Sequence, residues 1–417
     1  MIFLAAILGL SAGWCAWRRP VWGALVVFAL LPTYQWRFQI SGLPSTVLEI
    51  VLCAAVGGAA LHWLQQRSPW PRLGSLAYWA GGAWLVIGLG GVGVATDHLQ
   101  ALGLFRAYIL EPLLLIPLFV ALAQDAQARK YFTHLVSIQL FVFGLVAIGQ
   151  RFGWAASLAP WNAESPVRMT SLFAYPNAAA LYAAPLAAYV LGCWLAFRKQ
   201  IAGWERALWI IGTFSGVVVC ALAVSRGALL ALGFVAILAG TWSVRRWLWW
   251  GLCACALVGL LVFPVTRNQL TRIVTTKDTS ADVRTVLWQG TWSMLRDRPI
   301  VGAGLGAFPT VYNQYRLPKH VELLQYPHNL FLNVWSELGL AGLFFTLGII
   351  FWLSTSLFMQ LRRREAWAVG VLLAWVTLFI HGLVDVPFFK NDLAILTVVL
   401  FVLALRVPQL HNKIPPA

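Results

Sequence analysis

Long runs of apolar residues, separated by short polar segments, extend along most of the chain. A helix that crosses a lipid bilayer needs about 20 mostly apolar residues. Candidate spans cover residues 2–17, 20–34, 46–64, 75–94, 103–123, 132–149, 177–197, 206–223, 227–243, 246–264, 329–358, 367–386 and 391–407. Because the first two runs are short, the pattern predicts about 12–13 transmembrane helices.

The composition supports this interpretation. Of the 417 residues, 60% are hydrophobic and 11% are charged, whereas soluble domains are about 45–50% apolar and roughly 25% charged. The chain therefore lacks the polar residues to cover a soluble globule. Its 23 Trp, 24 Phe and 10 Tyr residues suit helix ends that lie in two membrane interfaces. We expect an all-α polytopic membrane protein. Residues 1–17 lack a basic leading segment, so a cleaved signal peptide is not expected.

Lys and Arg outnumber Asp and Glu by 16, and the placement of these cations predicts orientation. One set of short loops holds sixteen of them, the other set holds six, and the remaining eight lie in segment 265–328. Long loops count little toward the positive-inside rule. The richer set is therefore predicted to be cytoplasmic and segment 265–328 to lie outside. Most acidic residues fall on the outer side, where we expect the functional site.

Segment 265–328 is long enough to fold outside the bilayer. Thr279 and Asp282 resemble a capping box, and apolar residues follow at helical spacing until Pro299. These features predict an amphipathic helix with Arg284 at the margin of its apolar face. The glycine-rich stretch 301–307 is expected to form tight turns rather than a dinucleotide loop. The predicted division is 1–264, the N-terminal transmembrane helices; 265–328, the outer loop; and 329–417, the C-terminal helices with a short cytoplasmic tail.

His328 is the residue whose placement points most clearly to chemistry. It precedes the predicted span 329–358, at the outer mouth. A helix N-terminus attracts anions and disfavours an imidazolium ion, so a neutral His328 would be able to accept a proton. An interfacial histidine that only caps a helix is the alternative.

Four short motifs carry a family resemblance. His328 and Gly339 form His-x10-Gly, and Arg226 and Leu230 form Arg-x3-Leu. Placed on both sides of one long outer loop, this pair resembles the O-antigen ligase family. The stretches 168–177 and 284–288 are similar to blocks of the wider ligase and polymerase superfamily. The resemblance extends roughly from the third predicted span to the twelfth.

The resemblance implies a glycosyltransferase of GT-C architecture in the bacterial inner membrane, without a metal or nucleotide-sugar cofactor. The donor would be a polysaccharide on undecaprenyl pyrophosphate, and the acceptor a sugar hydroxyl of lipid A–core in the periplasm. His328, Arg226 and Arg284 are the implied catalytic residues. The assigned substrate-binding residues are Arg168, Arg37, Arg106, Tyr326 and Asn329.

The chemistry fits these residue types. A sugar pyrophosphate already has a good leaving group, so the reaction needs a base for the acceptor hydroxyl and cations for the developing charge. His328 would be the base, and the arginines would grip phosphate oxygens with their forked guanidinium groups. Direct attack opposite the leaving group would invert the anomeric centre.

Structural roles are the competing explanations for several charged residues. Arg226 would snorkel to the interface, Glu49 and Glu111 would order Arg37 or Arg106, and Glu337 would pair with an arginine. His381 and Asp385 would pair with each other at i, i+4. Asp278 and Asp282 are better explained by capping and salt bridging than by metal binding. The six cysteines all lie in apolar runs and form neither a disulfide framework nor a zinc motif.

Other functions remain open on the sequence alone. An O-antigen polymerase would use the same donor but a second lipid-linked glycan as acceptor. A protein-glycosylating oligosaccharyltransferase is a further enzyme class, and a lipid-linked oligosaccharide transporter is the non-enzyme alternative. A transporter is expected to have broken or polar helices near the midplane. The acceptor sugar, the repeat unit and the oligomeric state are not encoded in any pattern that we recognise.

Overall fold

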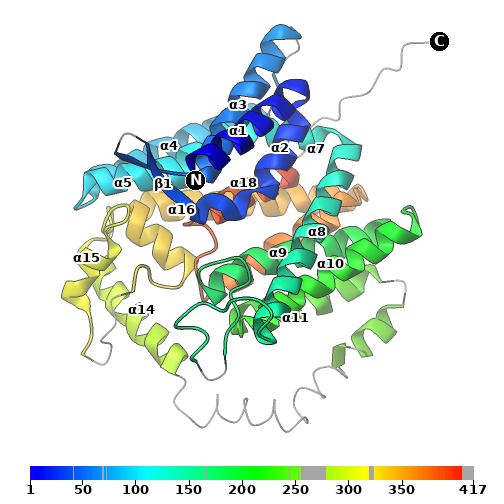
Figure 1. Ribbon diagram of the computed structural model, residues 1–417. Helices are drawn as coiled ribbons and strands as arrows, with labels where there is room; N and C mark the ends of the chain where they lie inside the picture. The colour runs from blue at the N-terminus through cyan, green and yellow to red at the C-terminus, as the bar shows by residue number, and fades with distance from the viewer. Residues whose placement is uncertain are drawn as a thin grey trace.

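The structure is a computed structural model that describes residues 1–405, apart from 41, 68–69, 72, 165–166, 244, 252, 255–278 and 319–323 (Figure 1). Within this part of the chain, seven helices are long and apolar enough to cross a membrane. They are α3 (Val47–Gln65), α4 (Ser75–Val94), the interrupted stretch His98–Gln124, α8 (Ala126–Arg151), α9 (Pro176–Phe197), α10 (Gly203–Leu222) and α16 (Leu330–Arg362).

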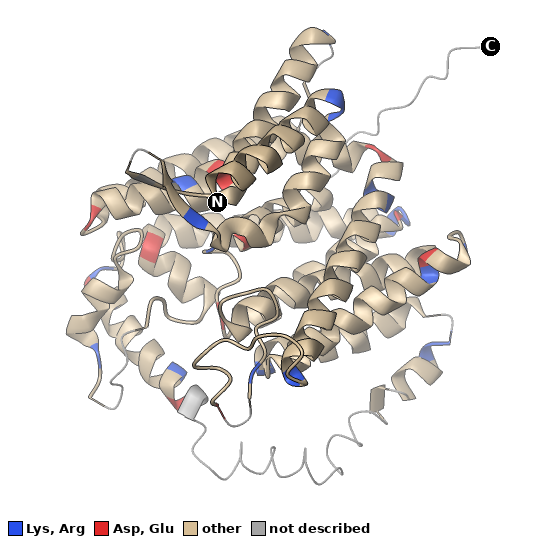
Figure 2. Ribbon diagram, viewed as in Figure 1, with Lys and Arg blue, Asp and Glu red and all other residues tan. Residues whose placement is uncertain are grey.

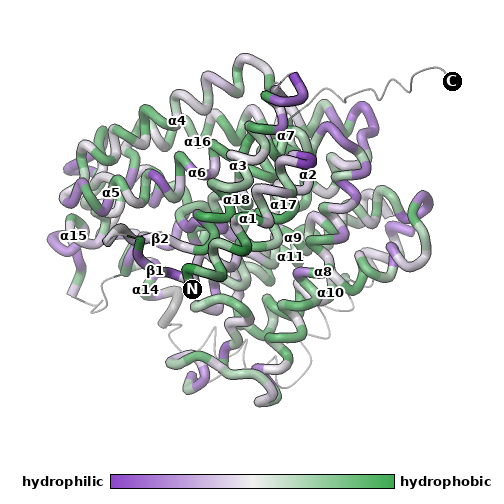
Figure 3. Tube along the Cα trace, turned by 45° about the horizontal axis from the view of Figure 1, so that its top comes forward, coloured by the Kyte–Doolittle hydropathy of each residue, from purple (hydrophilic) through white to green (hydrophobic). Residues whose placement is uncertain are grey.

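Five shorter apolar helices accompany them: α1 (Ile2–Arg18), α2 (Pro20–Ala29), α11 (Arg226–Ala239), α17 (Trp367–Gly382) and α18 (Asn391–Ala404). This architecture is that of an all-α polytopic membrane protein and confirms the predicted fold class. Most of the predicted span 246–264 and the tail 406–417 lie outside the described residues. Figure 2 shows the charged residues mostly at helix ends and in loops, and Figure 3 shows long hydrophobic stretches between them.

The stretch His98–Gln124 is not one regular helix. It consists of α5 (His98–Phe105), a π-helical turn η2 (Arg106–Leu110), α6 (Glu111–Leu114) and α7 (Ile116–Gln124). Pro112 and Pro117 lack the N–H donor that the helical ladder needs, and wide turns of this kind often mark functional positions. The interruption falls where Arg106 and Glu111 face charged partners.

A β-hairpin was not predicted from the sequence. Strand β1 (Arg37–Ile40) pairs antiparallel with β2 (Leu43–Thr46), after a short 3-10 helix η1 (Leu31–Gln35), and Gly42 takes φ 82° in the turn. Thr46 and Glu49 then form a capping box that starts α3. The hairpin therefore places Glu49 at the end of a membrane helix.

The described part of the outer loop contains the predicted helix. Helix α14 (Thr279–Asp297) ends two residues before Pro299, and the short helix α15 (Phe308–Tyr312), with the 3-10 turn η4 (Asn313–Tyr315), lies beside it (Figure 1). The side chains of residues 279–281 are not described, so the predicted capping at Thr279 lies outside the described part. Leu287 and Met294 are buried in one apolar cluster with Tyr312 and Val334, which attaches the loop to α16.

Gly339 breaks α16 close to its start. Its φ of 68° and ψ of −170° lie in a region that is essentially restricted to glycine, and a Cβ there would lie 2.2 Å from the Ile300 carbonyl oxygen. The N–H of Leu340 turns outward and donates to that same oxygen at 2.9 Å. The two ends of the His-x10-Gly motif thus bracket one short helical segment, 330–338, whose far end is docked onto the glycine-rich turn.

The glycine-rich turn fills a narrow space between α4 and α16. Gly302 lies so close to the Trp335 and Ser336 carbonyls that a Cβ would approach them to 2.5 Å and 2.4 Å, and Gly304 packs as closely on Ala95. The predicted tight turning is confirmed, and only glycine allows these backbone approaches. The turn fixes the outer loop against the start of α16, where the site lies.

Candidate functional site

His328 lies beside a buried carboxylate. Its ring Nδ1 is 3.1 Å from Oδ1 of Asp385, and the side chains are 19% and 2% exposed. A carboxylate can only accept, so we assign the proton to Nδ1, which leaves Nε2 as the acceptor of the neutral ring. The backbone N–H of Val386 also donates to Oδ1, at 2.9 Å. Asp385 therefore fixes the orientation and the tautomer of His328.

Asp385 belongs to the turn that follows α17, outside the helices. Burial raises the pKa of Asp385, but the hydrogen bond from His328 and the charge of that ring lower it by more, so its net pKa lies well below the ordinary value. The carboxylate consequently stays ionised at neutral pH. An ionised partner stabilises the positive charge that His328 gains when it accepts a proton.

Local backbone geometry holds this pair in place. His328 has φ 48° and stands two residues before α16, whose N-cap is Asn329. The Asn329 side chain accepts from the N–H of Leu332 at 3.0 Å and donates to the Leu383 carbonyl at 2.9 Å. One side chain thus caps the helix behind His328 and links it to the turn that carries Asp385.

Arg284 reaches the site from the outer loop. It lies one helical turn before Trp288 on α14, and the indole N–H of Trp288 donates to the Pro327 carbonyl at 2.8 Å. This contact fixes α14 against the residue that precedes His328. Arg284 is partly buried, and its charge acts on both Arg168 and Tyr326.

Arg168 is held by several contacts in the loop before α9. Its guanidinium donates to the Ala223 carbonyl at 3.0 Å and to Oδ1 of Asn177 at 2.6 Å, and it lies 3.9 Å from Glu164. Burial is the largest influence on the pKa of Arg168 and lowers it. The charges of Arg284, Asp385 and Arg226 also act on it.

Arg226 begins α11 where that helix meets the end of α17. A Cβ on the next residue, Gly227, would lie 2.6 Å from Val384 and 2.9 Å from the His381 ring. The start of α11 therefore packs on the turn that carries Asp385. The structure thus gathers Arg168, Arg226 and Arg284, three of the predicted site arginines, around the His328–Asp385 pair.

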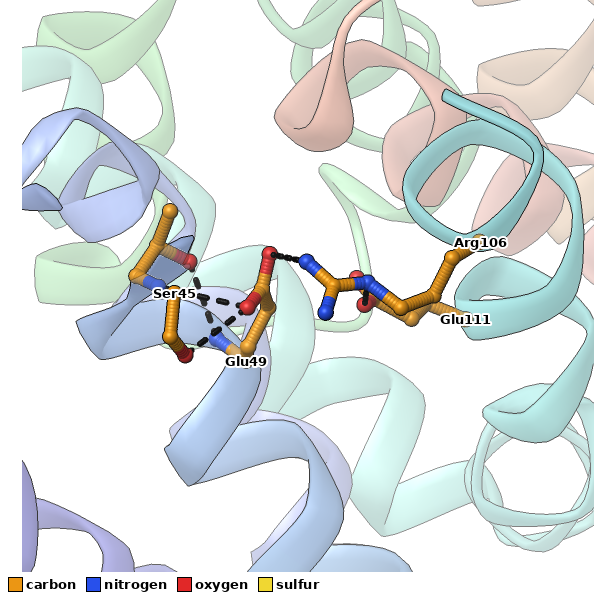
Figure 4. A network of polar contacts seen from close by, with 5 residues as sticks. Ser45, Glu49, Arg106 and Glu111 are labelled. Carbon is orange, nitrogen blue, oxygen red and sulfur yellow. Dashed lines mark hydrogen bonds and ion pairs between the residues drawn. The ribbon is translucent and has the colours of Figure 1, made fainter. Parts of the chain in front are cut away.

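Two other predicted substrate-binding residues lie on the hairpin side. Arg37 is exposed on β1. Arg106 contacts two carboxylates, Glu49 at 2.8 Å and Glu111 at 3.3 Å, as Figure 4 shows. The prediction that Glu49 and Glu111 order a neighbouring arginine is confirmed for Arg106, and Ser45 supports Glu49 with a hydrogen bond of 2.9 Å.

Tyr326 packs against the catalytic candidate. Its ring centroid lies 4.6 Å from that of His328. Burial raises the pKa of the Tyr326 phenol well above its ordinary value, and Asp385 adds to this effect. The phenol therefore stays neutral and can donate a hydrogen bond.

Two expected pairings are wrong. Glu337 accepts a hydrogen bond from the backbone N–H of Gly306 instead of meeting an arginine. The ion pair of Asp385 is with His328, not with His381 four residues earlier. Helix α17 ends at Gly382, so the i, i+4 spacing does not continue as helix to Asp385. The buried His381 Nδ1 is left without a hydrogen-bond partner. Among the described residues, no group of three His, Cys, Asp or Glu side chains could hold a metal ion.

The fold, together with this cluster of arginines around a histidine–aspartate pair, defines a multi-pass membrane protein with a cationic centre. Residues 211–347 match a family model described as O-Antigen ligase. The match contains Arg226, Arg284, His328 and Gly339, and it confirms the resemblance given by the motifs. The chain therefore carries a domain of the O-antigen ligase and polymerase superfamily. No curated protein matches the chain.

Asp385 lies outside the matched segment, and its link to His328 was missed from the sequence. The signal was present, because a carboxylate interrupts the apolar run 367–386 and intramembrane acids are costly unless paired. The nearest candidate in sequence, His381, was chosen as the partner. The partner that the fold provides, His328, precedes a different helix, α16.

Proposed function

We propose that this protein is an O-antigen ligase, which transfers a polysaccharide from undecaprenyl pyrophosphate to a sugar hydroxyl of lipid A–core on the periplasmic face of the bacterial inner membrane. The observation that carries the proposal is the His328–Asp385 pair beside Arg168, Arg226 and Arg284, within or next to a matched O-antigen ligase domain. A GT-C architecture is part of the same proposal.

His328 is the proposed general base. In the neutral ring, Nε2 would accept the proton of the acceptor hydroxyl as its oxygen attacks the anomeric carbon of the donor sugar. Asp385 holds the ring in this tautomer and stabilises the imidazolium that forms. A positioned base of this kind contributes about 10²–10⁴-fold to the rate.

The arginines are proposed to bind the pyrophosphate. Arg168, Arg226, Arg284 and Lys390 are four cations in electrostatic reach of a site that holds two carboxylates, Asp385 and Glu164. The surplus of positive charge suits a dianionic or trianionic leaving group, whose charge increases as the glycosidic bond breaks. Tyr326 and Asn329, next to His328, and Arg37 and Arg106 on the hairpin side are proposed to contact substrate.

The mechanism is direct displacement. The acceptor oxygen forms a bond to the anomeric carbon while the bond to the pyrophosphate oxygen breaks, and undecaprenyl pyrophosphate leaves with both electrons. Because the nucleophile enters opposite the leaving group, the anomeric configuration is inverted. No step requires a metal ion, because the cations of the chain neutralise the leaving group.

Reconstitution with two acceptors tests the assignment. Purified protein in EDTA receives undecaprenyl-pyrophosphate glycan together with lipid A–core, and the products are separated by size and by mass spectrometry. Transfer to lipid A–core with inverted configuration supports the ligase. Elongation of the lipid-linked glycan makes the protein a polymerase, and translocation without transfer makes it a transporter.

A further inference from the structure

An apolar slot lies between α4, α16, α17 and α18. Its walls include Trp84, Phe345, Phe379 and Phe401, and its empty volume is about 860 Å³, part of it open to the surroundings. Thr346 and Thr397 supply the only side-chain hydroxyl groups among the lining residues, and none of these residues is charged. The slot is therefore suited to hydrocarbon rather than to a sugar or a phosphate.

One end of the slot lies next to the candidate site in the sequence of two elements. Leu330, in the wall, is the first residue of α16 and stands two residues after His328. Phe388, also in the wall, stands three residues after Asp385 and makes an edge contact with Trp84 at 5.8 Å between ring centroids. Both segments that hold the His328–Asp385 pair therefore continue directly into the slot.

From this end the slot extends along α4, α17 and α18. On α4 the wall extends from Trp84 back to Ala77, seven residues, which is about 10 Å at the helical rise of ~1.5 Å per residue. Trp375, Leu378 and Phe379 of α17 and Thr397, Val398 and Phe401 of α18 form the facing walls. A chain in the slot would thus cross about a third of a ~30 Å hydrocarbon core.

We propose that this slot binds the first part of the polyprenyl chain of the donor and so selects the lipid that enters the site. The inference rests on the proposed function, because it assigns to the slot one of its two lipid substrates. A polyprenyl pyrophosphate has a single chain attached directly to the charged group. Lipid A carries several acyl chains side by side, which a single aromatic-lined slot does not accommodate. The acceptor therefore approaches His328 from outside the slot.

The geometry also explains how the donor is oriented. The pyrophosphate would rest among Arg168, Arg226 and Arg284 while the first isoprene units lie along the contacting rings of Trp84 and Phe388. Holding the pyrophosphate and the attached lipid chain fixes the leaving-group side of the reacting bond, which directs the anomeric carbon toward the acceptor hydroxyl. The remainder of the chain extends into the bilayer beyond Phe401.

Two neighbouring glycines provide a matched pair of variants. Gly81 lines the slot, whereas Gly82 does not and is exposed on the surface of α4. A Cβ at either position would meet no atom within 4 Å, so both tolerate a side chain. Gly81→Phe places a ring in the slot, and Gly82→Phe places the same ring one residue away.

The binding experiment uses a short polyprenyl pyrophosphate with a photoreactive diazirine on its second isoprene unit. The probe is crosslinked to the full-length protein in nanodiscs, and the labelled peptides are mapped by mass spectrometry. We expect labelling of α4, α16 and α18 in wild type and in Gly82→Phe, and a loss of at least tenfold in Gly81→Phe. Equal labelling in the two variants, or labelling on other helices, overturns the proposal. The proposal is also overturned if a phospholipid occupies the slot and the probe does not displace it.

A transfer experiment separates this inference from the proposed function. Gly81→Phe is expected to raise KM for a polyprenyl donor about tenfold and to leave KM unchanged within about twofold for a donor that carries a methyl group in place of the polyprenyl chain. Labelling of the slot without any transfer would refute the ligase assignment and support polyprenyl binding in the slot. Transfer to lipid A–core with equal donor KM in Gly81→Phe and Gly82→Phe would support the ligase assignment and refute polyprenyl binding in the slot.

Discussion

Asp385 accepts a hydrogen bond from Nδ1 of His328 across 3.1 Å, although 57 residues separate them in the sequence. They meet because the end of α17 packs against the start of α16, where a Cβ on Gly382 would lie 3.4 Å from Leu330. Any displacement of the 383–390 turn would therefore change the orientation of the proposed base.

Replacing Asp385 by Asn should abolish most transfer without unfolding the protein. The amide can donate to Nδ1, which would move the ring proton to Nε2 and remove the acceptor. We expect kcat to fall on the order of 10²–10⁴-fold, with KM for the donor nearly unchanged. Single-turnover transfer rates measure this, and partial recovery in Asp385→Glu separates a positioning role from general destabilisation. A variant with wild-type kcat would exclude Asp385 from the mechanism.

The lowered pKa of Asp385 predicts a pH dependence of stability. Because the folded-state pKa is below the unfolded value of about 4, the carboxylate stabilises the fold fully above that value and progressively less as pH falls through it toward the folded pKa. Differential scanning fluorimetry of wild type and Asp385→Asn should show a Tm difference that is constant from pH 6 to 5 and shrinks below about pH 4. A difference that grows on acidification would contradict this sign.

Arg284→Ala should reduce transfer far more than the same change elsewhere on α14. A cation that stabilises developing charge is worth on the order of 10²-fold in kcat/KM, and Arg284 is the arginine of α14 that acts on Arg168 and Tyr326. Arg296, three turns further along the helix, packs on Trp292 instead and is the control. Equal effects of Arg284→Ala and Arg296→Ala on kcat/KM would remove Arg284 from the site.

Gly339→Ala tests the structural role of the second motif residue. The backbone conformation there is restricted to glycine, and a Cβ would collide with the Ile300 carbonyl. We expect a loss of about 3 kcal/mol or more of stability, seen as a lower Tm in detergent. Gly348→Ala is the control in the same helix, because its Cβ would meet nothing within 4 Å. A Tm for Gly339→Ala equal to that of Gly348→Ala would contradict this explanation of the motif.

Arg106→Gln should destabilise the fold by roughly 1–3 kcal/mol, between the values for exposed and buried ion pairs. The change leaves Glu49 and Glu111 without their cation, and both carboxylates are at least nine-tenths buried. Adding Glu49→Gln should recover part of the loss in Tm. A rise in donor or acceptor KM that persists in the double variant would measure a substrate role for Arg106 beyond its ion pairs.

The membrane helices could be predicted from the sequence because each needs only a local apolar run. The predicted span 75–94 coincides with α4, and 177–197 differs from α9 by one residue. The prediction started α8 at residue 132, six residues late, because Arg129 and Lys130 interrupt the apolar pattern at the interface although the helix continues through them. The hairpin at 37–46 was missed because two four-residue strands are too short to show a clear alternation of apolar and polar residues.

The site could be predicted only in part. His328, Arg226, Arg284 and Arg168 were found because short motifs mark them, but the motifs do not say which groups touch. The pairing of His328 with Asp385, and of Glu337 with Gly306, depends on how distant helices pack. A carboxylate in an apolar run indicates that it needs a partner, but it does not identify the partner, since each partner lies on a different element of the chain.

The most direct test of the account is the rate of glycan transfer to lipid A–core by His328→Gln, measured in EDTA beside wild type and His98→Gln. His98 is also at the N-terminus of a helix and binds a backbone carbonyl, that of Val92, at 2.8 Å, so it controls for the loss of a histidine. The account predicts that wild type and His98→Gln transfer at similar rates and that His328→Gln is slower by at least 10²-fold. Transfer by His328→Gln at the wild-type rate would contradict it.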